Sequence, residues 1–352
     1  MKNLDRREFL ERSTLAAASL AVLRGQTAQA AQAGMFISLP PWAVARNVPW
    51  PEQAKLAARV GYRGIDWAFG PARQAGVDAT RALLAEIKIQ PTIVNLPMMN
   101  TLNADEAAFK AQLPKLDEDA AFSQAIGCKN FQLVLPATTP NGQTKDERWK
   151  VVRDRLAAIS EVLAKHDMRL GLEFLGPMVF RMPRAGGGRR GGAQAGPAAG
   201  AGAQPAPPAT PAAPAAPPVA PVTFVYTLPE TVKLSQESGP NIGATLDAWH
   251  WYHSGGTVAE ILATDKSRII HVHVSDAKQM PPEEVQDNMR WLPGEGIIDL
   301  VGFFQALKKI GYQGGVAPET IGPRIPDTMA PEESARLGLE TTMAVMKKAG
   351  VL

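Results

Sequence analysis

Several features are scarce in this chain of 352 residues, and each scarcity excludes a class of protein. The single cysteine, Cys128, cannot form an internal disulfide, and we expect it to be a small buried side chain. No apolar run reaches the roughly 20 residues that a transmembrane helix needs. Only five histidines are present, yet four of them form two close pairs, at 250 and 253 and at 271 and 273. These pairs are the first candidates for a functional site.

The first thirty residues have the layout of an export signal. A charged start is followed by a weakly apolar stretch at 14–23 and by the small-residue sequence AQA at 28–30. The string DRREFL at 5–10 resembles a twin-arginine signal. We therefore expect an export signal at 1–30, a single mature domain at 31–352, and a periplasmic or extracytoplasmic location. The alternative is that the first residues form an amphipathic helix of the mature fold.

The charge balance gives no sign of a nucleic-acid partner. Removal of 1–30 lowers the number of basic residues from 37 to 32 and of acidic residues from 34 to 31, which leaves the chain near neutral. A nucleic-acid binder usually carries a concentrated basic patch. We expect a small-molecule partner, no nucleic acid and no stable membrane span, and leave a homo-oligomer open.

One segment differs in composition from the rest of the chain. Residues 184–221 are almost entirely Ala, Gly and Pro, without apolar periodicity. Such a segment cannot bury enough surface to offset its chain entropy. Because the pattern on its two sides is the same, we interpret it as a disordered insertion within one domain, either a spacer or a mobile lid, and not as an interdomain linker.

Outside the insertion, the sequence alternates strand-like and helix-like segments. Several expected strands are continuous apolar runs, as in parallel sheets covered on both faces. Helical periodicity is clear in 145–166, where Val152, Leu156, Ile159 and Leu163 form one stripe. Eight strands alternating with eight helices predict an α/β fold, the (β/α)8 TIM barrel, with a doubly wound sheet as the alternative. The expected strands are Met35–Leu39, Gly64–Ala68, Pro91–Leu96, Asn130–Leu135, Leu170–Leu175, Ile242–Ala248, Ile269–Ser275 and Gly315–Glu319, and the expected helices are 51–61, 75–87, 104–126, 145–166, 228–238, 257–265, 299–311 and 332–348.

The last four strands each offer one metal-ligating side chain near the carboxyl end, where TIM barrels place their active sites. In the seventh strand, His271 and His273 face the same side, and His273 is nearer the carboxyl end. We interpret His271 as a buried, hydrogen-bonded histidine. Taken singly, each acid has an alternative reading as an ion-paired core residue. Three oxygens and one imidazole suit a divalent ion such as Mn, Mg, Co or Zn. The candidate ligands are Glu173, Asp247, His273 and Glu319.

The stretch ATLDAWHWYHSGG at 244–256 combines the candidate ligand Asp247 with aromatic side chains. We expect the end of the sixth strand here, followed by a loop. Trp249 and Trp251 have two readings, as ordinary core packing or as a platform for the apolar face of a sugar. His253 receives no role.

Four motifs resemble the xylose-isomerase-like TIM-barrel superfamily of sugar isomerases and epimerases. The resemblance implies a metal bound by Glu173, Asp247, His273 and Glu319, and its Asp-x-x-His pattern implies that His250 contacts the substrate. The motifs are GLEF at 171–174, LDAWH at 246–250, IIHVHVSDA at 269–277 and LPGEGIIDLVGFFQALKKIGYQGGVAPE at 292–319.

The sequence departs from the ketose 3-epimerases of that superfamily at two positions. Val179 stands where they carry a further acid, and Gln279 stands where they carry an arginine. These departures argue against a specific free-ketose epimerase. The endonuclease IV branch needs many more histidines than the early strands supply, so DNA repair is disfavoured.

The resemblance implies a metal-assisted proton transfer next to a carbonyl. Glu173 and Glu319 would exchange the proton through an enediolate, in an isomerase or epimerase acting on a sugar or glycoside. Two alternatives stay open: a metal-dependent lyase that catalyses β-elimination from a keto-glycoside, and an exported, non-catalytic sugar-binding protein.

Overall fold

The computed structural model describes residues 34–67, 69–140, 142–176, 223–281 and 284–352. Contacts between Cα atoms divide the chain into two units, Met1–Gly34 and Met35–Leu352, and the second unit carries the fold. The expected export signal and the expected insertion at 184–221 lie outside the described residues.

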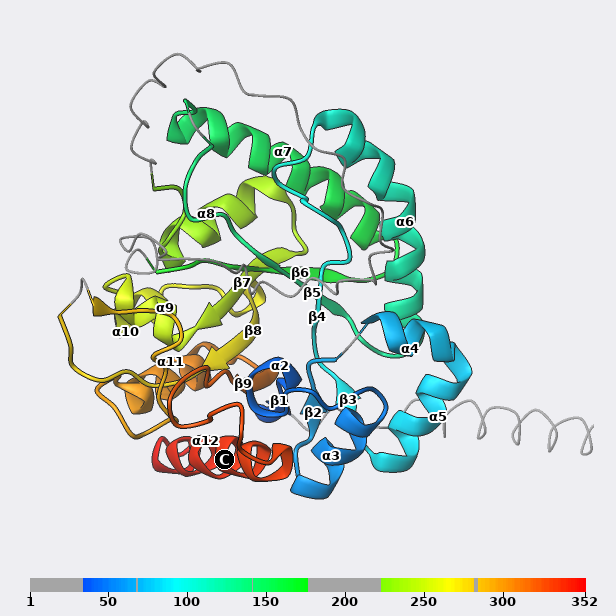
Figure 1. The fold of residues 1–352 in the computed structure, drawn as a ribbon. Helices are drawn as coiled ribbons and strands as arrows, with labels where there is room; N and C mark the ends of the chain where they lie inside the picture. Colours follow the sequence, from blue (N-terminus) through cyan, green and yellow to red (C-terminus); the bar gives the residue numbers. More distant parts are fainter. Residues whose placement is uncertain (1–33, 68, 141, 177–222, 282–283) are drawn as a thin grey trace, which may run out of the picture. The chain divides into compact units, whose positions relative to one another are not determined.

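The core of the Met35–Leu352 unit is a parallel sheet in the order β3-β2-β1-β9-β8-β7-β6-β5-β4 (Figure 1). The edge strands β3 and β4 are separated by only two residues of chain, Thr92 and Ile93, so the sheet curls round toward itself. This is an α/β TIM-barrel fold, as predicted. The strands are β1 (Phe36–Leu39), β2 (Gly64–Ile65), β3 (Gln90–Pro91), β4 (Val94–Asn95), β5 (Asn130–Val134), β6 (Arg169–Glu173), β7 (Ile242–Asp247), β8 (Ile269–Val274) and β9 (Gly315–Pro318).

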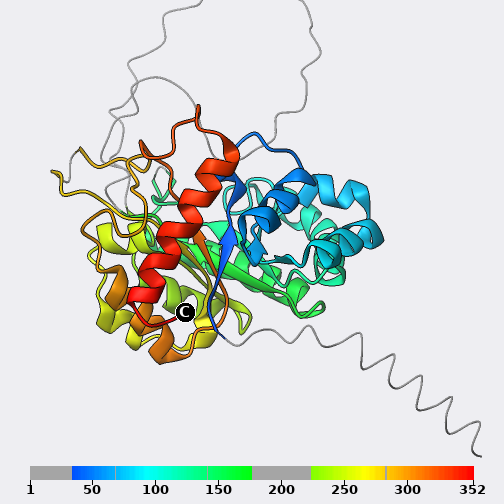
Figure 2. The same ribbon diagram turned by 90° about the horizontal axis from the view of Figure 1, so that it is seen from below.

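The helices surround the sheet, and α12 lies against β1 and α3, where the two ends of this unit meet (Figure 2). The eight predicted helices are present: α8 has the predicted bounds, and the other seven have ends shifted by one to three residues. Among the described residues, the short α-helices α2, α4 and α9 and a 3-10 helix at Lys266–Arg268 were not predicted. The helices are α2 (Pro41–Val44), α3 (Glu52–Val60), α4 (Phe69–Ala75), α5 (Val77–Ile87), α6 (Glu106–Ala125), α7 (Lys145–Ala164), α8 (Leu228–Ser238), α9 (Ala248–His253), α10 (Val258–Leu262), α11 (Leu300–Ile310) and α12 (Pro331–Lys348).

Local signals in the sequence set several of these helix boundaries. In α7, the Thr144 hydroxyl accepts from the Glu147 backbone, and the Glu147 carboxylate accepts from the Thr144 backbone, which is a capping box. Before α6, the Asp105 side chain accepts from the Ala108 backbone. These caps satisfy backbone N–H groups that the first helical turn leaves without partners.

The chain after β7 forms a helix, where the sequence predicted a loop. Asp247 ends the strand and also caps α9, because its Oδ1 accepts hydrogen bonds from the backbone N–H of Trp249 at 2.7 Å and of His250 at 3.2 Å. The loop prediction was wrong because a helix of six residues is too short to show apolar periodicity. The sequence signal for this helix is its capping residue, Asp247. Asp247 therefore has one carboxylate oxygen committed to the helix and one directed toward the barrel interior.

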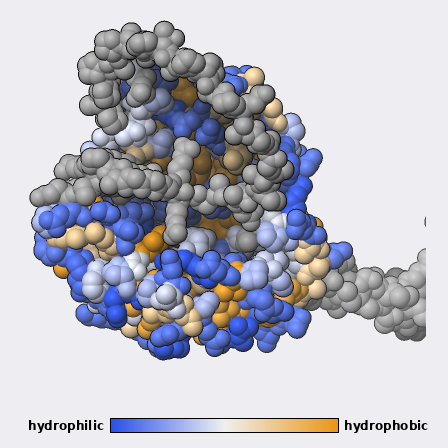
Figure 3. Space-filling model, viewed as in Figure 1, coloured by the Kyte–Doolittle hydropathy of each residue, from blue (hydrophilic) through white to orange (hydrophobic). Residues whose placement is uncertain are grey.

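Within the described residues, no helix is both long and apolar enough to span a membrane. On the visible part of the face shown in Figure 3, hydrophilic residues are mixed with smaller apolar areas, and apolar surface is also visible inside the hollow of that face.

A candidate metal centre at the carboxyl ends of the strands

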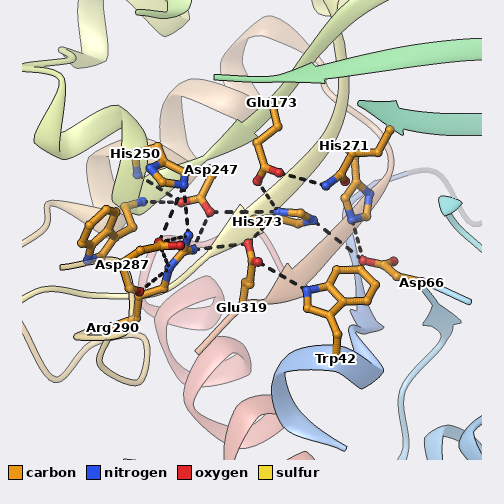
Figure 4. A network of polar contacts seen from close by, with 12 residues as sticks. Trp42, Asp66, Glu173, Asp247, His250, His271, His273, Asp287, Arg290 and Glu319 are labelled. Atoms are coloured by element: carbon orange, nitrogen blue, oxygen red, sulfur yellow. Dashed lines mark hydrogen bonds and ion pairs between the residues drawn. The ribbon is translucent and has the colours of Figure 1, made fainter. Parts of the chain in front are cut away.

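The four side chains selected from the strand ends lie together in the structure (Figure 4). Glu173 and Asp247 are the last residues of β6 and β7, and Glu319 directly follows β9. His273, on β8, lies opposite Asp247 in the sheet register. One donor atom from each side chain lies within 4.8 Å of all the others. The parallel register therefore gathers residues that are far apart in the sequence.

The ring of His273 lies at the centre of this group. Its Nδ1 is 2.8 Å from Glu173 Oε1, 2.8 Å from Glu319 Oε2 and 4.0 Å from Asp247 Oδ2. All four residues are buried, with exposed fractions between 0% for His273 and 8% for Glu319. Burying three ionised carboxylates raises the free energy of the folded state unless positive charge compensates them.

Two neutral side chains orient the glutamates. Gln132, on β5, donates from Nε2 to Glu173 Oε2 at 2.9 Å, and Trp42, on α2, donates from Nε1 to Glu319 Oε1 at 3.3 Å. Each glutamate therefore has one oxygen held from outside the centre and one directed at His273. Sequence reasoning selected neither residue, because a Gln within a strand and a Trp after β1 carry no signal of this contact.

Arg290 supplies positive charge from the loop between β8 and α11. Its Nη1 donates to Asp247 Oδ2 at 2.6 Å and lies 3.3 Å from Glu319 Oε2, and its Nη2 donates to Asp287 Oδ1 at 2.6 Å. Gln279, where the superfamily resemblance expects an arginine, is exposed. Sequence reasoning missed Arg290 because it lies farther along the loop than the family spacing indicates.

Asp276 holds the loop that carries Arg290. Its backbone forms two hydrogen bonds of 2.8 Å with Trp291, the residue that follows Arg290. This explains the PGEG sequence at 293–296, whose backbone N–H groups fold around one acid. The buried Asp276 carboxylate accepts four backbone hydrogen bonds, from Ala277, Gly294, Gly296 and Ile298.

Burial and neighbouring charges act in opposite directions on the titratable groups. Burial alone would lower the pKa of His273, but Glu319 and Glu173 raise that pKa well above its usual value. Burial raises the pKa of Glu319 above its usual value despite the nearby Arg290. Burial would also raise the pKa of Asp247, but Arg290 and two histidines bring it below its usual value. The centre is thus a place where positive charge is strongly favoured.

His250 contacts the arginine of the centre. Its Nδ1 accepts from the backbone N–H of Gly176 at 3.1 Å, and its Nε2 lies 3.1 Å from Arg290 Nη2. The ring is 1% exposed. In the structure, His250 is therefore buried against Arg290. A direct contact between His250 and the substrate stays a prediction.

The tryptophans of the predicted sugar platform are both buried. Trp249 is 1% exposed and Trp251 is 3% exposed. The Arg290 guanidinium lies 5.2 Å from the Trp249 ring centre, and Trp251 packs against Phe303. This burial favours core packing, the first of the two readings given above. By contrast, Trp42 is 37% exposed and packs edge-on against the His273 ring, so it is the accessible indole at the centre.

A second buried group lies on the other side of His273. Asp66 follows β2, and its Oδ2 is 3.1 Å from Nε2 of His271. Ser38, on β1, donates its hydroxyl to Asp66 Oδ1 at 2.7 Å. His271 is thus the hydrogen-bonded interior histidine that the sequence analysis expected, whereas Asp66 was not selected.

The profile of the Xylose isomerase-like TIM barrel family matches residues 54–182 and 218–348, which is more than half of the chain. The chain therefore belongs to this family, which the four sequence motifs already resembled. A crystal structure of the IOLI protein with a bound zinc atom has the same fold, with a TM-score of 0.67, 20% identity, and coverage of 90% of this chain and 99% of that chain.

The curated relatives match over a shorter region. An inosose isomerase of Halalkalibacterium halodurans is 32% identical over 108 residues, which is 31% of this chain and 38% of the relative. An inosose dehydratase of Histophilus somni is 28% identical over 111 residues, 28% of this chain and 37% of the relative. The chain thus spans well under half the length of these relatives.

Proposed function

We propose that this protein is a divalent-metal-dependent enzyme of the isomerase and epimerase type that acts on a sugar or glycoside. The observation that supports it most is the convergence of Glu173, Asp247, His273 and Glu319, with one donor atom of each within 4.8 Å of the others. The zinc atom in the structure of the similarly folded IOLI protein also supports a metal here.

The residues present fit a divalent cation. Three carboxylates and one imidazole nitrogen are a donor set typical of Zn, Mn or Co, and the oxygen-rich part also suits Mg. Arg290 alone does not balance the three buried acids, so a cation would relieve the remaining negative charge. Such an ion, when bound, polarises a substrate carbonyl as a Lewis acid.

In this proposal the two glutamates move the proton. Glu173 and Glu319 approach the same nitrogen of the His273 ring, each with one oxygen at 2.8 Å from Nδ1. One would take the proton from the carbon next to the substrate carbonyl, and the other would return it. Return to the opposite face gives an epimer, and return to the neighbouring carbon gives an isomer. The exposed Trp42 indole offers an apolar wall for the sugar beside them.

A lyase is the second candidate, and the similarity to an inosose dehydratase favours it. Elimination begins with the same proton abstraction, so Glu173 and Glu319 would keep their roles. The difference arises afterwards, when a leaving group departs from the carbon beyond the new double bond. A keto-glycoside or an inosose is the kind of substrate that allows this step.

The location proposed for this enzyme is the periplasm or another extracytoplasmic compartment. It rests on the arginine pair within DRREFL and the AQA sequence at 28–30. Replacing both arginines by lysine should keep the protein in the cytoplasm at its full precursor length. A protein that is still exported and cleaved would refute a twin-arginine route.

The experiment is a solvent-exchange screen on the purified, full-length protein. Metal content is first determined by elemental analysis, and then ketoses, inososes and 3-keto-glycosides are incubated with the metal-loaded protein in deuterated water. We expect deuterium at the carbon next to the carbonyl. Epimerisation or isomerisation retains all the heavy atoms of the substrate, whereas elimination releases water or an alcohol, and mass spectrometry separates the two.

The matched variants are Glu319→Gln and Glu295→Gln. Glu295 pairs with Arg324 at the surface, outside the centre, so its substitution should leave exchange unchanged. Glu319→Gln should reduce exchange at least about 100-fold, which is the usual contribution of a general acid or base. A properly folded protein without any bound divalent metal would refute the metal-dependent function.

A further inference from the structure

The two ring nitrogens of His273 face different surroundings. Nδ1 faces the carboxylates of Glu173 and Glu319. Nε2 points the other way and has no hydrogen-bond partner among the described residues, although His273 is 0% exposed. Within the described part of the chain, the carboxylate recorded nearest to that nitrogen belongs to Asp66, whose Oδ2 is 3.9 Å away. Figure 4 shows Asp66 and the three acids on opposite sides of the ring.

We propose that Asp66 is a positioning residue of the metal centre. Its carboxylate accepts a hydrogen bond from the Nε2–H group of His273 when Nδ1 binds the cation. This inference rests on the proposed metal dependence. A neutral imidazole that binds through one nitrogen carries its proton on the other. A buried N–H without an acceptor is unfavourable, and ligand histidines usually donate to a carboxylate or carbonyl.

Asp66 is already held in place for this role. Its Oδ1 accepts from the Ser38 hydroxyl at 2.7 Å, and that hydroxyl in turn lies 2.7 Å from the Thr92 hydroxyl. Its Oδ2 uses one lone pair for His271 at 3.1 Å and has a second one free for His273. The residue is 0% exposed, so bulk solvent does not reach that lone pair. The distance of 3.9 Å between Nε2 of His273 and Oδ2 of Asp66 exceeds a normal hydrogen bond by about 0.7 Å, so a small shift of the ring would form one.

The same three side chains also have a second conceivable use, as ligands of another cation. One donor atom each from Asp66, His271 and His273 lies within 4.8 Å of the others. The existing contact argues against that use, because Asp66 Oδ2 and His271 Nε2 lie 3.1 Å apart and already satisfy each other as a hydrogen bond.

The test measures metal binding and not turnover. Apo protein is titrated with Zn²⁺ against a chromophoric chelator, and Co²⁺ is used for the visible spectrum of the bound ion. We expect one ion per wild-type chain, and a loss of affinity of about 10- to 100-fold in Asp66→Asn, the usual effect of removing such a partner. The Co²⁺ spectrum of this variant should change, because the imidazole is less firmly oriented.

The matched control is His271→Gln, which retains a donor for Asp66 and leaves the acid in place. Its affinity for Zn²⁺ should stay within about threefold of wild type, far from the loss expected at position 66. Equal losses in both variants would mean general damage to the interior and would overturn the proposal.

A measurement on the wild-type protein covers the case in which Asp66→Asn does not fold. Long-range ¹H–¹⁵N spectra of the Zn²⁺-loaded protein should show the His273 proton on Nε2. A deprotonated Nε2, or two ions per chain, would overturn the proposal in favour of a second cation. A wild-type protein that binds no ion would refute the metal centre itself, whereas equal affinity in wild type and Asp66→Asn would refute only the role of Asp66.

Discussion

Arg290 and Asp247 form a buried ion pair, with Nη1 2.6 Å from Oδ2 and each residue 1% exposed. The pair joins the loop before α11 to the strand end that carries a proposed metal ligand. Removing one partner of such a pair lowers the free energy of unfolding by far more than the intact pair contributes to it, because the remaining charge stays buried without a partner.

We therefore expect Arg290→Gln to lower the free energy of unfolding of the metal-free protein by about 3–5 kcal/mol. A divalent cation should restore part of the loss, since it compensates the same acids. Urea unfolding with and without metal measures both effects. Arg324→Gln is the control, because its pair with Glu295 is largely exposed and should contribute less than about 1 kcal/mol. Equal effects of the two substitutions would contradict this prediction.

The stability of the fold should depend on pH through His253. The pKa of this residue is lowered to about 4, mainly by burial and further by the charges of His250 and Arg290. The unfolded chain takes up a proton here near pH 6.5, whereas the folded chain does so only near pH 4. The contribution is therefore fully present above about pH 6.5 and is lost as the pH falls toward 4. In His253→Gln, the free energy of unfolding should fall less steeply over this range, and parallel profiles would show the idea to be wrong.

Gly171 should be required for the alignment of β6 with β7. A methyl group at this position would lie 2.3 Å from Thr245 Oγ1, so the Thr245 side chain or one of the strands would have to move. We expect Gly171→Ala to destabilise the protein by about 1–3 kcal/mol and to weaken metal binding, because Glu173 and Asp247 end these strands. The double variant with Thr245→Ala should recover most of both losses in unfolding and Zn²⁺ titrations. No recovery would mean that the Thr245 hydroxyl is not the obstacle.

Cys128 should be inert in the folded protein. Burial raises the pKa of its thiol to about 12, and the residue is 0% exposed. Thiol reagents react with the thiolate, which is absent at pH 8 and shielded from solvent. We expect no labelling of native protein over an hour and complete labelling in guanidinium chloride, as followed by mass spectrometry. Rapid labelling of the native protein would show that this interior opens readily.

Sequence patterns were sufficient to predict the barrel and to select the four residues that the structure brings together. The reason is that parallel strands have all their carboxyl ends at one edge of the sheet. Acids and histidines at the ends of successive strands are therefore expected to lie close together in space. The alternation of His271 and His273 gave both the side and the depth of each ring. The strand predicted at 91–96 was correct in place but is divided by Thr92 and Ile93.

The residues that were missed act across long separations in the chain. Trp42 reaches Glu319 over 277 positions and Asp66 reaches His271 over 205. Such contacts depend on how loops return to the barrel, which neither periodicity nor motif spacing records. Arg290 belongs to the same class, since its place is set by the fold of the loop around Asp276. The proposed export signal and the composition-biased insertion stay predictions.

The pairing of β1 with β9 has a consequence for the order of events in biosynthesis. Phe36 lies opposite Gly315, so β1 can form this pairing only after β9 has been synthesised. A nascent chain that ends before β9 holds three of the four donors and lacks Glu319, the one that Trp42 orients from the opposite terminus of the fold. A complete set of ligands for the proposed cation therefore forms only once β9 has been synthesised and the barrel has closed.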